Sequence, residues 1–84
     1  KNPGIILQQK DAKTRLQEFL QAQGSPLPIY DVVKVTGDQH MQQFLVECRV
    51  DSVEWVAKGK GSSRRKAEQQ AAAAFIEHLE GRKS

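Results

Sequence analysis

The 84-residue sequence has little of what cross-links a chain or carries it through a membrane. Its single cysteine, Cys48, excludes an internal disulfide and fits a reducing compartment. No apolar run approaches the roughly 18 residues that a transmembrane helix requires. No signal peptide is visible, and because the chain begins with Lys1 instead of methionine, we expect a piece of a longer protein. These absences favour a cytoplasmic protein with no membrane partner.

Residues that carry catalysis or bind metals form no pattern either. The two histidines, His40 and His78, are expected in a loop and near a helix end, and no cysteine pair accompanies them. The ten acidic residues are scattered, without a cluster suited to two metal ions. Cys48 falls on the apolar face of a predicted strand, where an inert buried thiol is the usual state. We therefore expect no catalytic residue, metal ligand or cofactor in this chain.

The composition that is present favours one small folded domain. Hydrophobic residues make up 38% of the chain and charged residues 27%, as in soluble globular proteins. A chain of 84 residues can bury a single small core. Residues 1–10 contain Pro3 and Gly4 and show no regular hydrophobic period, so we interpret them as a linker or tail. The folded domain is expected to comprise residues 11–84.

Hydrophobic periodicity predicts the order of the elements. Apolar residues define one face of a first helix that Asp11 caps: Ala12, Leu16, Phe19 and Leu20. Three β-prone segments with short connections favour an antiparallel meander, and an alanine-rich helix follows it. The predicted bounds are a helix over 11–23, strands over 29–36, 44–50 and 53–59, and a helix over 63–80. We therefore predict an α+β fold of order α-β-β-β-α, with both helices packed on one face of a three-stranded antiparallel sheet.

A dense basic segment surrounds the start of the second helix. Five cations lie within nine residues that contain no acid: Lys58, Lys60, Arg64, Arg65 and Lys66. The last three follow Ser62 and Ser63, either of which can cap the helix. Cations at a helix start oppose the helix dipole, at a cost of a few tenths of a kcal/mol up to ~1 each. Because the same helix start offers backbone N–H groups to an anion, the segment predicts a polyphosphate partner.

The first helix carries a second candidate surface opposite its apolar face. Polar side chains form this strip: Thr14, Gln17, Glu18 and Gln21. Mostly uncharged donors and acceptors beside a cationic patch suit ribose 2′-hydroxyl groups. His40, in the loop predicted between the first two strands, is a third candidate contact.

The order of elements and these motifs resemble the double-stranded RNA-binding domain. "PLPIYDVV" is similar to the proline-x-tyrosine motif that opens the family's first strand, and "GKGSSRRKAEQQAA" to its glycine-x-glycine-x-serine-lysine-lysine-x-alanine stretch. Arg64 and Arg65 take the two lysine positions, and Glu68 falls where many members carry a third lysine. The resemblance covers residues 11 to about 80 and is nearest to the C-terminal domain of bacterial ribonuclease III, whose acidic catalytic helix is missing here.

The resemblance implies a mode of binding to double-stranded RNA by shape. Thr14, Gln17 and Glu18 would contact one minor groove, and His40 the next. The residues bridging phosphates across the intervening major groove would be Lys60, Arg64, Arg65 and Lys66. A-form RNA fits this scheme, because only its wide minor groove, lined with 2′-hydroxyls, is accessible to side chains.

The resemblance also implies a longer parent protein, while two other interpretations stay open. The parent would be a ribonuclease III, a homodimeric endoribonuclease with Mg²⁺ in a catalytic domain absent from this chain. One alternative is a protein-interaction or dimerisation module of the same fold. Another is a DNA-binding domain that uses the basic helix start.

Overall fold

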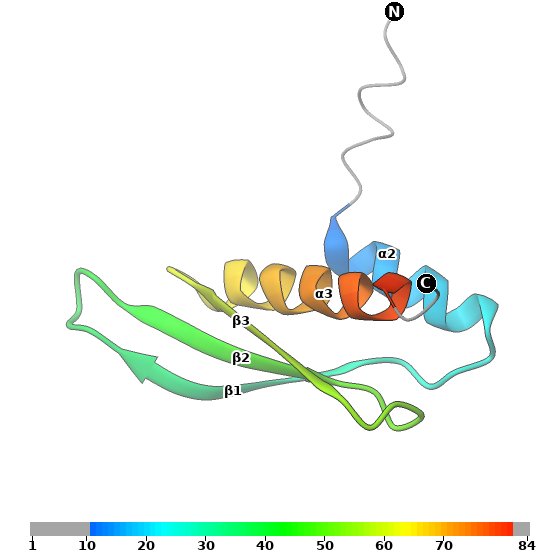
Figure 1. Cartoon of the computed structure of the whole chain (residues 1–84). Coiled ribbons are helices and arrows are strands. Elements are labelled where there is room, and N and C mark those ends of the chain that lie inside the picture. Colours follow the sequence, from blue (N-terminus) through cyan, green and yellow to red (C-terminus); the bar gives the residue numbers. More distant parts are fainter. Residues whose placement is uncertain (1–10, 82–84) are drawn as a thin grey trace, which may run out of the picture.

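Residues 11–81, which the computed structural model describes, form two helices and one sheet (Figure 1). The elements are α2 (Ala12–Ala22), β1 (Ile29–Thr36), β2 (Gln43–Arg49), β3 (Val56–Gly61) and α3 (Arg64–Gly81). This order confirms the predicted fold class. The linker or tail predicted over 1–10 lies outside the described residues. Neither helix in the described part of the chain is long and apolar enough to cross a membrane.

Helix α2 begins where its capping residue predicts. The Asp11 carboxylate accepts a hydrogen bond of 2.9 Å from the backbone N–H of Thr14, which otherwise has no partner within the helix. Leu16 and Leu20 are buried and lie one turn apart, so they share the face that enters the core. The opposite face, with the polar strip, is left to solvent.

The three strands lie side by side in chain order and are antiparallel. Val46 and Cys48 of β2 are fully buried, as their alternate spacing predicts. Val32 of β1 pairs with Val46, and Ala57 of β3 pairs with Cys48, so these residues extend the inward face across the sheet.

The third strand begins at Val56, three residues after the predicted start. The N–H of Val53 donates to the carbonyl oxygen of Val50 at 2.9 Å, which places it in a turn. The Trp55 ring stacks on the His78 ring of α3, with 3.8 Å between the ring centroids. The predicted start was wrong because these tertiary contacts, and not the β propensity of the segment, decide its conformation.

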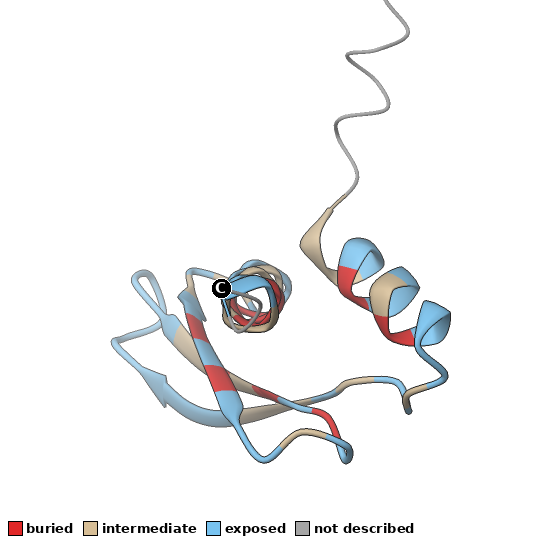
Figure 2. Ribbon diagram, turned by 45° about the vertical axis from the view of Figure 1, so that its right-hand side comes forward, coloured by how far each residue is buried: buried red, intermediate tan, exposed pale blue. Residues whose placement is uncertain are grey.

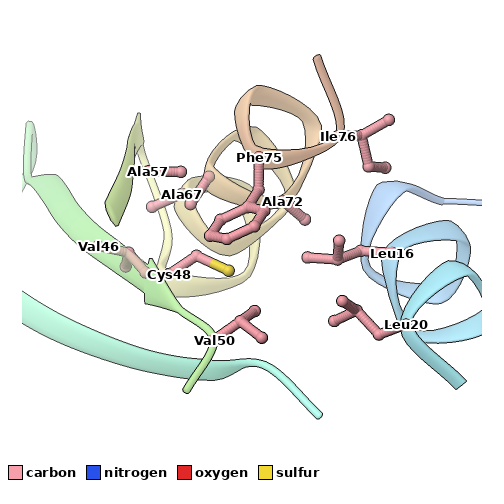
Figure 3. Packing of buried hydrophobic residues seen from close by; sticks show 11 residues of the cluster. Leu16, Leu20, Val46, Cys48, Val50, Ala57, Ala67, Ala72, Phe75 and Ile76 are labelled. Carbon is pink, nitrogen blue, oxygen red and sulfur yellow. The ribbon is translucent and has the colours of Figure 1, made fainter. Parts of the chain in front are cut away.

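Small residues let α3 lie close to the sheet. A Cβ atom at Gly59 would lie 2.3 Å from the amide nitrogen of Ala71, and one at Gly61 would lie 2.6 Å from that of Ala67. Both distances are too short for a side chain, so glycine is required on this face of β3. Figure 3 shows the fully buried Phe75 of α3 between the sheet and the leucines of α2.

Both helices lie on the same side of the sheet, but only α3 covers it. Helix α3 packs across β2 and β3, whereas α2 packs mainly against α3 (Figure 2). The position of α2 is therefore set by α3. This arrangement places the exposed face of α2 beside the start of α3.

Candidate nucleic-acid interface

The start of α3 carries its cations on the surface. Of the two candidate caps, Ser63 is the one used: its hydroxyl oxygen accepts from the N–H of Lys66 at 3.2 Å, and its carbonyl oxygen from the N–H of Ala67 at 3.0 Å. Arg64, Arg65 and Lys66 are all exposed, and the first turn contains no acid. The unfavourable charge pattern predicted from the sequence is thus present at the helix start.

Residues of both helices line one open groove, although they are far apart in the sequence. The groove has a volume of about 620 Å³. Its lining comprises Asp11, Lys13, Thr14 and Gln17 at the α2 side and Arg64, Arg65, Glu68 and Gln69 of α3. The structure therefore brings four of the predicted contact residues together: Thr14, Gln17, Arg64 and Arg65. Glu18 and Lys66 are exposed on the same two helices but do not line the groove.

Polar side chains of α3 fasten the start of α2 beneath this groove. The side-chain oxygen of Gln69 accepts from the backbone N–H of Ala12 at 2.8 Å. The carboxylate of Glu68 forms ion pairs with Lys13 at 2.5 Å and with Arg64 at 2.9 Å. Both helices are thus tied together at the surface that the sequence predicts to be functional.

The carboxylates of the groove keep their charge at neutral pH. Burial raises the pKa of Glu68, but the hydrogen bonds from Lys13 and Arg64 outweigh it and leave the pKa below its ordinary value. The backbone N–H of Thr14 likewise lowers the pKa of Asp11. Three cations, Lys13, Arg64 and Arg65, therefore line the groove with two carboxylates.

His40 lies at the tip of a separate projection. The loop between β1 and β2 extends from one end of the sheet, at the left of Figure 1, whereas α2 lies at the right. The Asp38 carboxylate accepts from the N–H groups of His40 and Met41, at 2.9 and 3.0 Å. Gly37 has a φ of 88°, which favours glycine. This turn presents His40 to solvent, away from the groove.

Lys60 lies on the other side of the sheet from the groove. Its neighbours Gly59 and Gly61 face α3, so alternation along β3 turns Lys60 outward. There it lines a small hollow together with Lys34 and Leu45. The structure does not bring Lys60 together with the arginines of α3.

Two candidate kinds of reactive group, a metal cluster and the cysteine thiol, can be checked in the described residues. Residues 11–81 contain no group of three or more histidine, cysteine or acidic side chains that could hold a metal ion. Cys48 is fully buried, and burial raises the pKa of its thiol to about 11. At neutral pH the thiol is therefore protonated and unsuited to nucleophilic attack.

The sequence of residues 12–79 matches the profile of the double-stranded RNA binding motif. The chain belongs to this family. Similar structures support the assignment: the motif shares 33% identity and a TM-score of 0.66 with a structure of Arabidopsis HYL1, covering 81% of this chain and 94% of that one.

Several relatives of this double-stranded RNA binding motif are bacterial proteins named Ribonuclease 3. That of Idiomarina loihiensis is 61% identical over 72 residues, which cover 86% of this chain and 31% of the relative. That of Vibrio atlanticus is 54% identical over 77 residues, which cover 92% of this chain and 33% of the relative. The chain thus spans about one third of the length of these relatives.

Sequence reasoning missed the residues that support the motif's groove. Two contacts join the helices: Glu68 accepts from Lys13, and Gln69 accepts from the backbone N–H of Ala12. No local sequence pattern predicts contacts between residues so distant in the chain. The spacing of Arg64 and Glu68, four positions apart on one helix, is the one signal that was visible.

Proposed function

We propose that this chain binds double-stranded RNA by its shape, with little preference for sequence. The observation that carries the proposal is the groove in which two residues of the polar strip, Thr14 and Gln17, lie opposite Arg64 and Arg65 of α3. Such a surface offers donors and acceptors to ribose hydroxyls and cations to phosphates within one site. A-form RNA presents those two groups side by side along its minor groove and backbone.

Each part of the surface has a proposed role. Thr14, Gln17 and Glu18 contact 2′-hydroxyls in one minor groove, and His40 enters the next one. Arg64, Arg65 and Lys66 contact phosphates across the major groove between them. Two features support this division: α2 and the β1–β2 loop lie at opposite ends of the molecule, and the start of α3 lies between them (Figure 1). Lys60 remains a predicted phosphate contact, although its outward direction on β3 separates it from the others.

We further propose that the chain is the substrate-binding part of a larger endoribonuclease. The Ribonuclease 3 relatives support this, since each extends well beyond the matched segment. The parent enzyme would act in the cytoplasm as a homodimer and would hold Mg²⁺ in a catalytic domain outside this chain. The present domain would bring double-stranded RNA to that centre.

A comparison of RNA and DNA duplexes tests the proposed function. Filter binding with duplexes of equal length and sequence should show clear binding to RNA and much weaker binding to DNA, which lacks 2′-hydroxyls. Equal affinities would favour the DNA-binding alternative. Absence of binding to either duplex would contradict the proposal and favour the protein-interaction module.

A further inference from the structure

Glu68 is a carboxylate in a place where the proposed function calls for cations. It lies on α3 one turn after Arg64 and lines the groove, with 11% of its side chain exposed. Its charge repels phosphates, and none of the proposed RNA contacts uses it. The other buried residues of α3 are all apolar, so Glu68 is the one charged residue among them.

The two oxygens of Glu68 bind cations from two different helices. Oε1 accepts from Lys13 Nζ at 2.5 Å, and Oε2 accepts from Arg64 Nε at 2.9 Å. Lys13 Nζ also lies 5.0 Å from the ring centroid of Tyr30, a residue of β1. One carboxylate therefore links α3 to α2 and, through Lys13, to the sheet.

The contact with Arg64 uses only one edge of its guanidinium. Glu68 accepts from Nε, and the described residues provide no other partner for this side chain, which is 61% exposed. Because the guanidinium is planar and carries five N–H donors, fixing Nε also fixes the direction of the terminal NH₂ groups. Those groups stay available to an acceptor in the groove.

We propose that Glu68 is a positioning residue for RNA: it holds Arg64 ready for a phosphate and holds the α2 strip at a set separation from it. This inference rests on the proposed function. An arginine that is already ordered loses less conformational freedom on binding than a mobile one. The gain from this order exceeds the repulsion between the Glu68 carboxylate and the phosphates.

Glu68→Gln tests the inference, because positioning and charge predict opposite results. The substitution keeps the size of the side chain and removes its charge. Loss of positioning should weaken binding to a duplex RNA by about two- to tenfold, the range for ordering one long side chain. The log–log salt slope of RNA binding by Glu68→Gln should also decrease in magnitude, toward the slope measured for Arg64→Ala. Tighter binding would show that Glu68 competes with phosphate for Arg64, and would overturn the inference.

A double-mutant cycle separates positioning from a general effect on folding. If Glu68 acts through Arg64, Arg64→Ala with Glu68→Gln should bind within about twofold of Arg64→Ala alone. Arg65 is the matched control, because no bond joins it to Glu68 in the described structure: Arg65→Ala with Glu68→Gln should show the sum of the two single effects. Additive effects in both cycles would overturn the inference. Circular dichroism checks that each variant is folded.

Two further comparisons keep the outcome decisive. Should Glu68→Gln not fold, Arg64→Lys and Arg65→Lys carry the test, since lysine keeps the charge but lacks the fork that Glu68 holds. Positioning predicts the larger decrease in affinity at Arg64, and equal decreases would contradict it. If the wild-type chain binds RNA and Arg65→Ala binds it more weakly, but Glu68→Gln binds as well as wild type, then only this inference is contradicted. Failure of the wild-type chain to bind RNA removes the proposed function itself.

Discussion

At the scale of single residues, the neighbours of each cation decide what its removal does. Arg64 is paired with Glu68, so its removal also leaves a carboxylate with one partner fewer. Arg65 is exposed in the first turn of α3 and has no ion pair among the described residues. Arg65 therefore reports the phosphate contact more cleanly than Arg64.

Arg65→Ala should weaken binding to double-stranded RNA while leaving the stability unchanged or slightly higher. The helix dipole opposes a cation at this position, so its removal relieves a small repulsion. Without this phosphate interaction the log–log salt slope should decrease in magnitude by a little under one unit, by analogy with roughly 0.9 for duplex DNA. Titrations at several salt concentrations, with thermal unfolding, check this. An unchanged slope in Arg65→Ala would refute the phosphate interaction.

Glu18→Ala should lower the affinity for RNA although it removes a negative charge. We expect this because Glu18 is proposed to accept hydrogen bonds from 2′-hydroxyls, and long-range electrostatics alone predicts the reverse. The control is Glu77→Ala, which removes an exposed acid near the C-terminal end of α3, outside the proposed contact surface. Titration of both variants with one RNA duplex decides, and tighter binding by Glu18→Ala would rule out its groove contact.

At the scale of elements, the packing of α3 on β3 sets where both helices lie. Helix α2 rests mainly on α3, and α3 rests on the glycine-containing strand β3. A change in the spacing between α3 and the sheet therefore moves the whole groove relative to the β1–β2 loop. Glycine in β3 is a structural condition for the binding surface, although it makes no proposed contact with RNA.

Gly59→Ala should destabilise the domain by ~1–3 kcal/mol, the usual cost of inserting atoms into a packed core. Its new methyl group would lie 2.3 Å from the Ala71 nitrogen and 2.4 Å from the Ala67 carbonyl oxygen, both backbone atoms. Chemical denaturation measures the decrease in stability. Gly81→Ala is the matched control, because a Cβ there meets nothing within 4 Å. Equal stability of both variants would contradict the close approach of α3 to the sheet.

The link between α2 and α3 should also give the domain a particular sensitivity to acid. Because the folded-state pKa of Glu68 is lowered from its ordinary 4.5, its contribution to stability is complete above that pH and is lost as the pH falls through the lower value. Denaturation of wild type and Glu68→Gln at a series of pH values measures the difference. The stability gap between them should narrow below about pH 4.5, and a constant gap would contradict the lowered pKa.

At the scale of the whole molecule, local sequence patterns predicted the helices and strands, while tertiary contacts set where β3 begins and how the helices pack. Asp11 as a cap and the alternation of Val46 with Cys48 were readable from sequence, because they depend on neighbours in the chain. The start of β3 could not be predicted from sequence, because it depends on the stacking of Trp55 on His78 of α3. Alternation along the strand predicts that Lys60 points outward. The sequence interpretation instead grouped Lys60 with the cations of α3 as one binding surface.

The same distinction applies to the candidate site. The sequence placed polar residues on one helix and cations on another, but not in one groove. Their juxtaposition comes from the packing of α2 on α3 and from the contacts of Glu68 and Gln69, which join distant parts of the chain. The separation between α2 and the β1–β2 loop follows from the length and direction of the sheet (Figure 1).

Two distant surfaces of the domain are proposed to bind two minor grooves of one RNA duplex. The most direct test compares wild type and His40→Ala on a long duplex and on one well short of the roughly 16 base pairs of a full footprint. The short duplex cannot offer both grooves at once. His40→Ala should therefore weaken binding to the long duplex and change little on the short one. An equal decrease in affinity for both duplexes would contradict binding at two grooves.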